Sequence, residues 1–318
     1  MQSVKNPPRL AIVVPCYNEE AVLKETNTRL TSLLKELASQ SKIKADSFIV
    51  YVNDGSKDQT WSLIHQLGEE DTCVRGVKLA HNAGHQNALM AGLESFKGEA
   101  DALVTIDADL QDDVNAIKAM VDEYLAGADI VYGVRKERTT DSFFKRTTAL
   151  AFYKLMAIMG TDTVYNHADY RLMSKRAIQA LCQYPERNLF LRGLVPLLGF
   201  NTKKVYYDRA ERFAGESKYP LKKMLAFAID GITSFSIKPI TVILVTGFIC
   251  FLIGILMLFW GLYSYFFGTA VPGWTSLMVS LWLISGVVIM SLGVIGEYIG
   301  KIYIEVKQRP RYHIQEVV

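Results

Sequence analysis

Residues 102–112 read ALVTIDADLQD, an apolar run that ends in the acidic residues Asp107, Asp109 and Asp112. Such a run, bounded by polar residues, is typical of a buried parallel strand. Asp107 and Asp109 flank Ala108 directly after it. In a doubly wound α/β sheet, ligands bind at the carboxyl ends of the strands. The stretch therefore predicts both a fold class and the edge of the sheet on which a site lies.

Four further apolar runs extend this pattern in both directions. We expect strands at 10–14, 48–52, 74–79 and 130–134, besides the one at 102–106, and crossover helices at 19–38, 59–69, 84–96 and 114–126. Strands that alternate with helices in this way predict a Rossmann-like α/β domain with a mostly parallel sheet.

Polar clusters follow four of the expected strands. They read PCYNEE at 15–20, NDGSKD at 53–58, HNAGH at 81–85 and DADLQ at 107–111, so they include Gly84 and Ala108. Because the carboxyl ends of these strands meet at one edge, the clusters are expected to converge on one crevice.

The Asp107–Asp109 pair suits a divalent cation. Both carboxylates can turn toward the crevice, with Gln111 as a neutral oxygen donor or acting through water. Such ligands favour Mg²⁺ or Mn²⁺, which keep several waters and bridge to substrate phosphates. An Asp-x-Asp triplet is weak evidence alone, and its place after a buried strand strengthens it.

The first two polar clusters suit a nucleotide. Asp54 could accept the imide N–H of uracil, and Gly55 lets the backbone turn closely beneath a ligand. An Asx turn that caps the next helix is an equal alternative for Asp54. Pro15, Tyr17, Asn18 and Glu19 could likewise be a helix entrance, and their coincidence with the other clusters favours a nucleotide site.

Basic residues that could stabilise a departing diphosphate are Arg135, Arg138, Arg212 and Lys218. Arg135 follows the fifth expected strand, which places it at the correct edge. A solvated or headgroup-facing side chain is an alternative for each of them. No histidine is assigned a catalytic role, and His167 is interpreted as a loop residue.

No charged residue occurs between Lys238 and Glu297. The interval holds two apolar runs of membrane-spanning length, at 240–267 and 277 to about 295, separated by the turn-forming residues 268–273. Basic residues flank both runs and none lies in the loop, so both ends are expected in the cytoplasm. A buried hairpin of soluble helices is the alternative.

Segments 142–160 and 218–235 look like amphipathic helices at the membrane surface, although ordinary packing on the sheet would also explain them.

Composition agrees with this interpretation. The chain is 50% hydrophobic with a net charge of only +3, so charge gives no argument for a nucleic-acid partner. Its four cysteines are widely spaced and suggest a reducing compartment rather than a zinc site or disulfide framework. The apolar run at 10–14 is too short for a signal-peptide core, so residue 1 onward is expected to stay in the cytoplasm.

The sequence resembles the family 2 glycosyltransferases with the GT-A fold, in the polyprenyl-phosphate branch that includes dolichyl-phosphate mannose synthase and GtrB-type enzymes. The motifs that carry the resemblance are VVPCYNEE at 13–20, VNDGSKD at 52–58, HNAGHQ at 81–86, IDADLQD at 106–112, ADYRLM at 168–173 and RFAGESKY at 212–219. Asn53 departs from the pattern, because many relatives carry a second aspartate there.

The resemblance implies roles for these motifs. Asp54 and the 17–19 loop would hold the nucleoside, and Asp107, Asp109 and Gln111 the metal and diphosphate. Asp169 would lie near the acceptor and the anomeric carbon. The loop that contains Arg212 and Lys218 would close over the donor.

We therefore expect four parts: a cytoplasmic GT-A domain at 1–215, an amphipathic helix at 216–235, two transmembrane helices at 236–300 and a tail at 301–318. The expected function is inverting transfer of a hexose, glucose from UDP-glucose by resemblance, to undecaprenyl phosphate at the inner membrane, with Asp169 and Asp109 as catalytic residues. A phosphate acceptor is already ionised at neutral pH and needs little help from a base.

A separate flippase and a downstream transferase are expected partners, and homo-oligomerisation is left open. Alternatives are another donor, GDP-mannose or a UDP-aminosugar, or a non-catalytic component of lipid-linked sugar transport.

Overall fold

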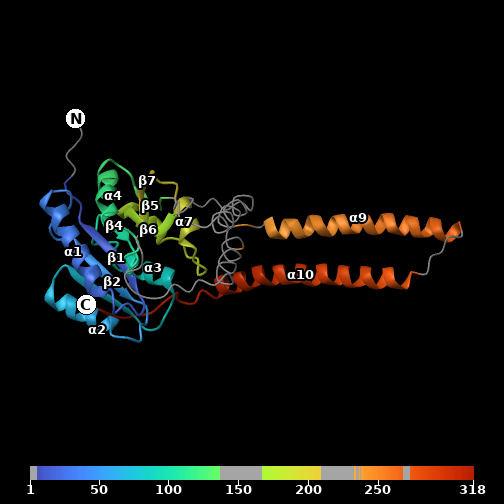
Figure 1. Cartoon of the computed structure of the whole chain (residues 1–318), viewed down its shortest axis with the longest axis horizontal. Coiled ribbons are helices and arrows are strands. Elements are labelled where there is room, and N and C mark those ends of the chain that lie inside the picture. Colours follow the sequence, from blue (N-terminus) through green and yellow to red (C-terminus); the bar gives the residue numbers. More distant parts are fainter. Residues whose placement is uncertain (1–5, 137–166, 209–232, 234–235, 237, 268–272) are drawn as a thin grey trace. The chain divides into compact units, whose positions relative to one another are not determined.

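One eight-stranded sheet, in the order β7-β5-β6-β4-β1-β2-β3-β8, organises the first of two compact units in the computed structural model (Figure 1). The structure describes residues 6–136, 167–208, 233, 236, 238–267 and 273–318. The first unit contains the sheet and the C-terminal residues from Arg309, and the second contains the two long helices α9 and α10.

The five strands expected from the sequence are confirmed. They are β1 (Leu10–Cys16), β2 (Phe48–Asn53), β3 (Val74–Leu79), β4 (Ala102–Thr105) and β5 (Ile130–Arg135). β1 pairs in parallel with both β2 and β4, so Val13 lies opposite Val50 on one side and Thr105 on the other. β1, β2 and β4 are buried along their whole length, which explains why their sequences are continuous apolar runs.

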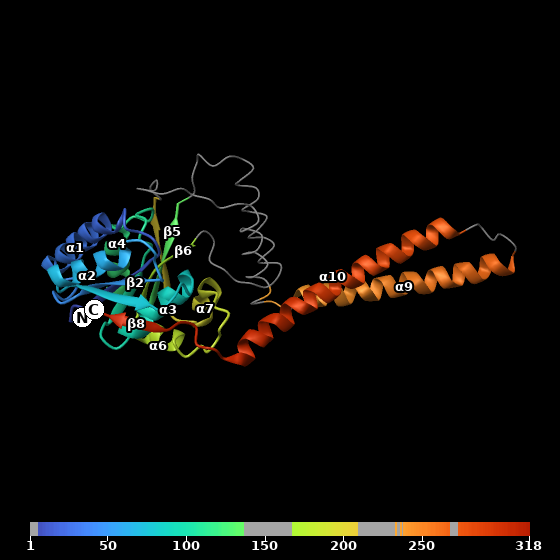
Figure 2. The same cartoon turned by 90° about the horizontal axis from the view of Figure 1, so that it is seen from below.

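The four expected crossover helices are also present: α1 (Leu23–Ser39), α2 (Thr60–Glu70), α3 (His85–Phe96) and α4 (Ala116–Leu125). Side chains of α1, α2 and α4 share one core with Ile12 and Val14 of β1. Helix α3 packs where Val13 points, because a Cβ added at Gly92 would lie 2.4 Å from Val13 Cγ1. Alternate residues of β1 thus face opposite helical layers. Figure 2 shows helices on both faces of the sheet.

Several elements were not expected from the sequence. β6 (His167–Ser174) pairs antiparallel with both β4 and β5, and β7 (Thr202–Tyr207) lies parallel to β5. The helices α6 (Lys175–Leu181) and α7 (Leu191–Leu197) lie between them in the chain. β6 reads HADYRLMS and buries Arg171, so it lacks the apolar run by which the other strands were found.

The C-terminal residues differ from the expected tail at 301–318. Helix α10 (Trp274–Lys307) continues past the predicted end at 300. After it, β8 (Ile314–Val317) pairs antiparallel with β3. Glu94 of α3 accepts hydrogen bonds from Arg311, at 2.6 Å, and from the Tyr312 hydroxyl. The chain end is therefore part of the sheet domain.

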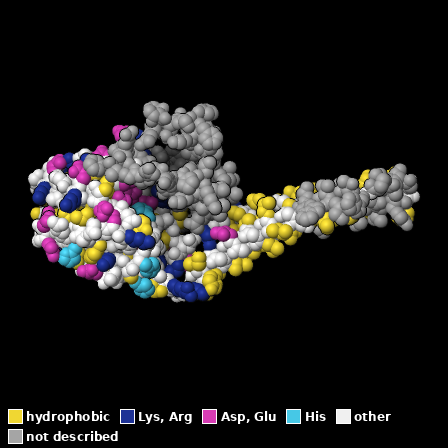
Figure 3. Space-filling view, turned by 60° about the horizontal axis from the view of Figure 1, so that its bottom comes forward, with side chains coloured by type: hydrophobic (Ala, Val, Ile, Leu, Met, Phe, Trp, Pro, Cys, Tyr) yellow, Lys and Arg dark blue, Asp and Glu magenta, His cyan; other side chains and the backbone are white. Residues whose placement is uncertain are grey.

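The second unit consists of α9 (Lys238–Phe266) and α10. Its described side chains include many exposed large apolar residues, for example Leu244, Phe259 and Ile289 (Figure 3). Among the described residues, one helical segment, Ile284–Lys307, is long and apolar enough to cross a membrane. The shorter apolar segment Lys238–Ile249 belongs to α9, so two crossings stay a prediction. The amphipathic segments expected at 142–160 and 216–235 lie outside the described residues, apart from Thr233.

Candidate active site

A cavity of about 360 Å³ lies at the carboxyl ends of β1, β2 and β4. Its described lining comes from the loops after β1, β2, β3 and β4, the start of α3, the start of β6 and helix α7. The lining residues are Pro15, Cys16, Tyr17, Glu19, Asp54, Asn82, Gly84, His85, Ala88, Asp107, Ala108, Asp109, Asp169 and Arg192. The loops after β1, β2, β3 and β4 thus meet in one crevice, as the strand order requires.

Most residues proposed from the sequence line this crevice. They are Pro15, Tyr17, Glu19, Asp54, Gly84, Asp107, Ala108, Asp109 and Asp169. Asn18, Gln111 and Arg135 are not among the described lining residues. Arg138, Arg212 and Lys218 lie outside the described residues.

Asn18 joins the first two loops instead of lining the crevice. Its backbone, at φ 56°, lies in the left-handed region. Its N–H donates to Ser56 Oγ at 3.0 Å, and its Oδ1 accepts from the N–H of Lys57 at 2.9 Å. The N–H of Glu19 donates to Thr60 Oγ1 at 2.9 Å. These bonds hold the loop after β1 against the loop after β2, which fixes Tyr17 and Glu19 at the crevice wall.

Asp54 organises a third loop. Its carboxylate accepts the backbone N–H of Ala83 at 2.6 Å and that of Gly84 at 3.1 Å. Burial raises the pKa of this carboxyl, and the two N–H groups only partly offset the rise. The expected Asx turn to the following helix is made by Asp58, whose Oδ1 accepts the N–H of Thr60 at 3.0 Å. Asp54 therefore shapes the wall of the crevice at the start of α3.

Gly55 allows the close approach of two loops. Its φ is +65°, and a Cβ added there would lie 2.5 Å from the backbone nitrogen of Asn82. From the sequence we expected glycine here to let the backbone turn closely beneath a ligand. The structure shows the backbone of the neighbouring loop in that space.

Asp107 and Asp109 both line the crevice directly after β4. Leu110 follows with φ +57°, a left-handed conformation that is costly for a branched residue. The N–H of Gln111 donates to Asp109 Oδ1 at 3.1 Å. Burial raises the pKa of Asp107; His85 opposes the rise, and neighbouring carboxylates reinforce it. A cation beside this pair would relieve the repulsion.

The donor set fits a partly hydrated cation. No cluster of three or more His, Cys, Asp or Glu side chains within the described residues could hold a metal alone. Two carboxylates at a strand end suit Mg²⁺ or Mn²⁺, whose remaining positions are taken by water and substrate phosphates.

Asp169 faces the crevice from the start of β6. Its Oδ1 lies 2.5 Å from Nη2 of the buried Arg171, and its Oδ2 lies 3.2 Å from Nη2 of Arg192. His85 Nε2 lies 3.9 Å from the same Oδ2 and 3.5 Å from Asp107 Oδ1. Burial alone would raise the pKa of Asp169, but the charges of Arg192 and Arg171 outweigh it and hold this pKa well below its ordinary value. An ionised, doubly paired carboxylate is a weak general base.

His85 was expected at the crevice as part of the 81–85 cluster but was given no role, and Arg192 was not expected there. His85 carried a signal, because it follows Gly84 in a loop already placed at the site. Arg192 carried none, since α7 was not expected. The N–H of Leu191 donates to Gln86 Oε1 at 2.7 Å, which ties the start of α7 to α3.

Arg135 is engaged by residues outside the described crevice lining. Its guanidinium lies 3.0 Å from the Oδ1 of the buried Asp112 and 3.2 Å from the hydroxyl of Tyr207, which itself donates to Asp112 at 2.6 Å. Burial would lower the pKa of Arg135, but Asp112 and Tyr207 raise it overall. This network anchors the end of the loop that carries Asp109 and Gln111.

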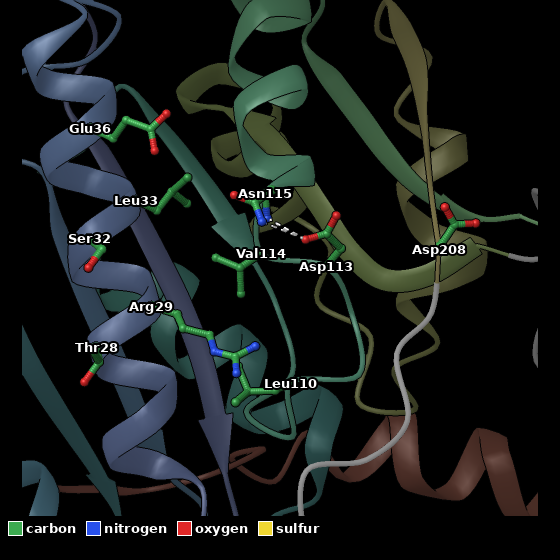
Figure 4. Close-up of a pocket in the computed structure, with 10 residues that line it drawn as sticks. All are labelled: Thr28, Arg29, Ser32, Leu33, Glu36, Leu110, Asp113, Val114, Asn115 and Asp208. Carbon is green, nitrogen blue, oxygen red and sulfur yellow. Dashed lines mark hydrogen bonds between the residues drawn. The ribbon is translucent and has the colours of Figure 1, made fainter.

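A second cavity, of about 470 Å³, lies between α1 and the start of α4 (Figure 4). Arg29 and Glu36 of α1 and Asp113 and Asp208 are among its lining residues. It shares with the first cavity only the loop after β4, and the loops after β1, β2 and β3 are absent from its described lining. The smaller cavity, where four strand-end loops meet, is therefore the candidate active site.

Comparison with known proteins agrees with this assignment. Residues 11–182 match the family described as "Glycosyl transferase family 2". The chain is 51% identical over 310 residues to the "Uncharacterized glycosyltransferase YkoT" of Bacillus subtilis (strain 168), covering 98% of this chain and 92% of that protein. It is 40% identical over 313 residues to the "SfII prophage-derived bactoprenol glucosyl transferase" of Shigella flexneri, covering 97% of this chain and 98% of that protein.

Solved structures give a more distant similarity. The glucosyl-3-phosphoglycerate synthase of Mycobacterium tuberculosis, in complex with Mn²⁺, UDP-glucose and phosphoglyceric acid, is 19% identical with a TM-score of 0.47. The match covers 71% of this chain and 78% of that one.

Proposed function

Since the chain belongs to glycosyl transferase family 2 and is a glycosyltransferase with a GT-A domain, we propose that it transfers glucose from UDP-glucose to a polyprenyl phosphate at the membrane surface. The observation that carries this proposal is the crevice at the strand ends, where the Asp107–Asp109 pair and Asp169 line one cavity. The relatives named bactoprenol glucosyl transferases, similar over nearly the whole chain, support both the sugar and the lipid acceptor.

The wall formed by the first three loops is proposed to hold the nucleoside. Tyr17 and Glu19 line it, and Asp54 keeps Ala83 and Gly84 in place through their N–H groups. The base would lie against Tyr17, whose ring is partly exposed. The bonds between Asn18 and the loop after β2 keep this wall in one shape before the donor binds, which lowers the entropic cost of binding.

Asp107 and Asp109 would hold Mg²⁺ or Mn²⁺ beside the diphosphate. A divalent cation at this point stabilises the charge that develops on the leaving group. Arg135 supports the same loop through its contact with Asp112. Arg212 and Lys218 are proposed to reach the diphosphate from the loop at 212–219, as the family resemblance implies.

The acceptor phosphate is proposed to attack the anomeric carbon directly, which inverts its configuration. A phosphate monoester with a second pKa near 6 is mostly ionised at neutral pH, so the reaction does not require the weak base that Asp169 provides. No second carboxylate is needed to form a covalent glycosyl intermediate.

The helical unit is proposed to anchor the enzyme. Similarity to bactoprenol glucosyl transferases implies membrane association, and the apolar segment Ile284–Lys307 fits a crossing. We propose that α9 and α10 form a two-helix hairpin in the inner membrane, with the sheet domain in the cytoplasm. A separate flippase would then move the product across the bilayer, and a downstream transferase would use it.

The test is a donor panel. The detergent-solubilised full chain is incubated with undecaprenyl phosphate and radiolabelled UDP-glucose, UDP-N-acetylglucosamine or GDP-mannose, and the label in the organic extract is counted. Label from UDP-glucose supports the proposal, with a β-linked product expected by NMR from the α-linked donor. Label from another donor alone would leave the acceptor assignment intact and overturn the choice of glucose.

A further inference from the structure

The crevice is rich in negative charge. The described residues that line it include five carboxyl groups, on Glu19, Asp54, Asp107, Asp109 and Asp169. Within that same described lining, Arg192 is the sole lysine or arginine. A reaction between a diphosphate donor and a phosphate acceptor brings several further negative charges into this space. A cation bound by Asp107 and Asp109 serves the donor, and the acceptor phosphate needs a cationic group of its own.

Arg192 lines the crevice beside Asp169, the residue that the family resemblance places near the acceptor. Its Nη2 contacts Asp169 Oδ2 at 3.2 Å. Its side chain is 32% exposed, whereas Arg171, on the other oxygen of Asp169, is 2% exposed. Both arginines therefore pair with one carboxylate, and Arg192 is the one that a ligand in the crevice can reach.

The backbone just before Arg192 is held at two points, because both the N–H and the carbonyl of Leu191 make hydrogen bonds to side chains. The N–H of Leu191 donates to Gln86 Oε1 at 2.7 Å, and its carbonyl accepts from Arg171 Nη1 at 3.4 Å. Asp169 adds a third restraint, on the guanidinium itself. A guanidinium held in this way is ready for bidentate binding of phosphate without further loss of side-chain entropy.

The same contacts argue against proton transfer by Asp169. Each of its oxygens already faces a guanidinium, and the pairing holds its pKa low. Its geometry suits a residue that aims Arg192 better than one that removes a proton.

We propose that Arg192 binds the phosphate group of the acceptor and that Asp169 is a positioning residue that holds the Arg192 guanidinium toward it. This inference rests on the proposed function, because it assumes a phosphate acceptor. The donor diphosphate offers the same chemistry, so the experiment must separate the two sources of phosphate.

The first arm measures binding without turnover. Undecaprenyl phosphate is titrated into the detergent-solubilised full chain in the presence of UDP, with undecaprenol as the lipid control and UDP alone as the donor-side probe. Arg192→Gln is expected to weaken the binding of undecaprenyl phosphate at least about tenfold, the effect of one charged hydrogen bond. Its affinity for UDP should stay within about twofold of the wild-type value. Arg29→Gln, on an exposed part of α1 away from the crevice lining, is the matched control and should bind both ligands like the wild type.

The second arm measures steady-state kinetics. Arg192→Gln should raise the acceptor KM with little change in the donor KM, and Arg192→Lys should recover part of the loss. Asp169→Asn should raise the acceptor KM in the same direction, and the double variant should be no worse than Arg192→Gln, because one interaction is removed in both. A thermal melt of each variant checks folding, since Asp169→Asn leaves Arg171 without its carboxylate.

Three results would overturn the inference. Weaker UDP binding by Arg192→Gln, with unchanged binding of undecaprenyl phosphate, would assign Arg192 to the donor. Unchanged binding of both would remove it from the site. A fall in kcat for Asp169→Asn at unchanged acceptor KM would make Asp169 the base. If the wild type itself binds no undecaprenyl phosphate above the undecaprenol control, it is the proposed function that fails.

Discussion

The carboxylate of Asp54 and the backbone N–H of Gly84 are 3.1 Å apart, although the two residues lie 30 positions apart in the chain. With the N–H of Ala83 on its other oxygen, Asp54 determines where the loop after β3 ends and α3 begins. Gly84 and His85, which line the crevice, owe their positions to this buried side chain.

Asp54→Asn should release this loop. The amide oxygen of an asparagine can accept only one of the two N–H groups, and its NH₂ turns a donor toward the other. We therefore expect the free energy of unfolding to fall by about 1–3 kcal/mol. Hydrogen exchange at Ala83 and Gly84 should accelerate, and UDP should bind more weakly. Glu69→Gln, on the exposed face of α2, is the control. Unchanged exchange at these two amides would show that Asp54 does not hold the loop.

Gly55 and Gly199 allow a matched test of loop packing. Their φ values are +65° and +67°, but a Cβ at Gly199 meets no atom within 4 Å, whereas at Gly55 it meets the Asn82 backbone at 2.5 Å. Gly199→Ala should lower the free energy of unfolding only by the left-handed penalty of about 1–2 kcal/mol. Gly55→Ala should lower the free energy of unfolding by about 1–3 kcal/mol more than this, through overpacking, and should weaken UDP binding. Equal thermal shifts in the two variants would contradict the close approach of the loops.

The sequence predicted the strand-end aspartates well and for a physical reason. Asp107 and Asp109 come directly after a continuous apolar run, and a parallel strand brings the residues after its carboxyl end to the ligand edge of the sheet. The same rule placed Arg135 at the correct edge. It could not show that Asp112 and Tyr207 engage the guanidinium, because Tyr207 ends a strand, β7, that the pattern did not indicate.

The wall of the crevice that contains Asp169 and Arg192 was less predictable. β6 is antiparallel and carries the buried Arg171 among polar residues, so its sequence lacks an apolar run. α7 spans only seven residues, too few for a periodic signal to separate it from a loop. Arg192 was therefore identified as a site residue only from its contact with Asp169 in the structure. Asp169 itself was proposed from family resemblance.

Glu94 should be important for retaining the C-terminal strand. It pairs with Arg311, whose side chain is 10% exposed, and also accepts the Tyr312 hydroxyl. Glu94→Gln leaves the arginine without a counter-charge, and loss of this partly buried charged hydrogen bond should lower the free energy of unfolding by about 1–3 kcal/mol. Hydrogen exchange in residues 314–318 and in β3 should increase, and the exposed β3 edge should promote association of the protein.

The exposed Glu316 of β8 provides the control for that experiment. Glu316→Gln should leave exchange in β3 and β8 unchanged. Protection that persists in Glu94→Gln would mean that the β3–β8 pairing alone retains the chain end.

The ion pair of Asp129 with Arg176 predicts how the stability of the protein depends on pH. The hydrogen bond from Arg176 lowers the pKa of this nearly buried carboxyl, and Ser174 adds to the effect. A carboxyl with a depressed pKa contributes stability above its unfolded pKa of about 3.9, and this contribution is lost as the pH falls through the lower folded value. Asp129→Asn should therefore lower the thermal midpoint at pH 7 and have a shrinking effect below about pH 4. A midpoint difference that stays constant down to about pH 3 would rule out the ionised pair as its source.

The metal-bearing crevice is tested most directly by transfer of radiolabelled glucose from UDP-glucose to undecaprenyl phosphate by the full chain, compared with Asp109→Asn and with EDTA treatment. We expect label in the lipid extract for the wild type, its loss by at least about a hundredfold in Asp109→Asn, and recovery of the EDTA-treated enzyme on addition of Mg²⁺ or Mn²⁺. Undiminished transfer by Asp109→Asn or in EDTA would contradict the metal-bearing crevice as the place where the sugar is transferred.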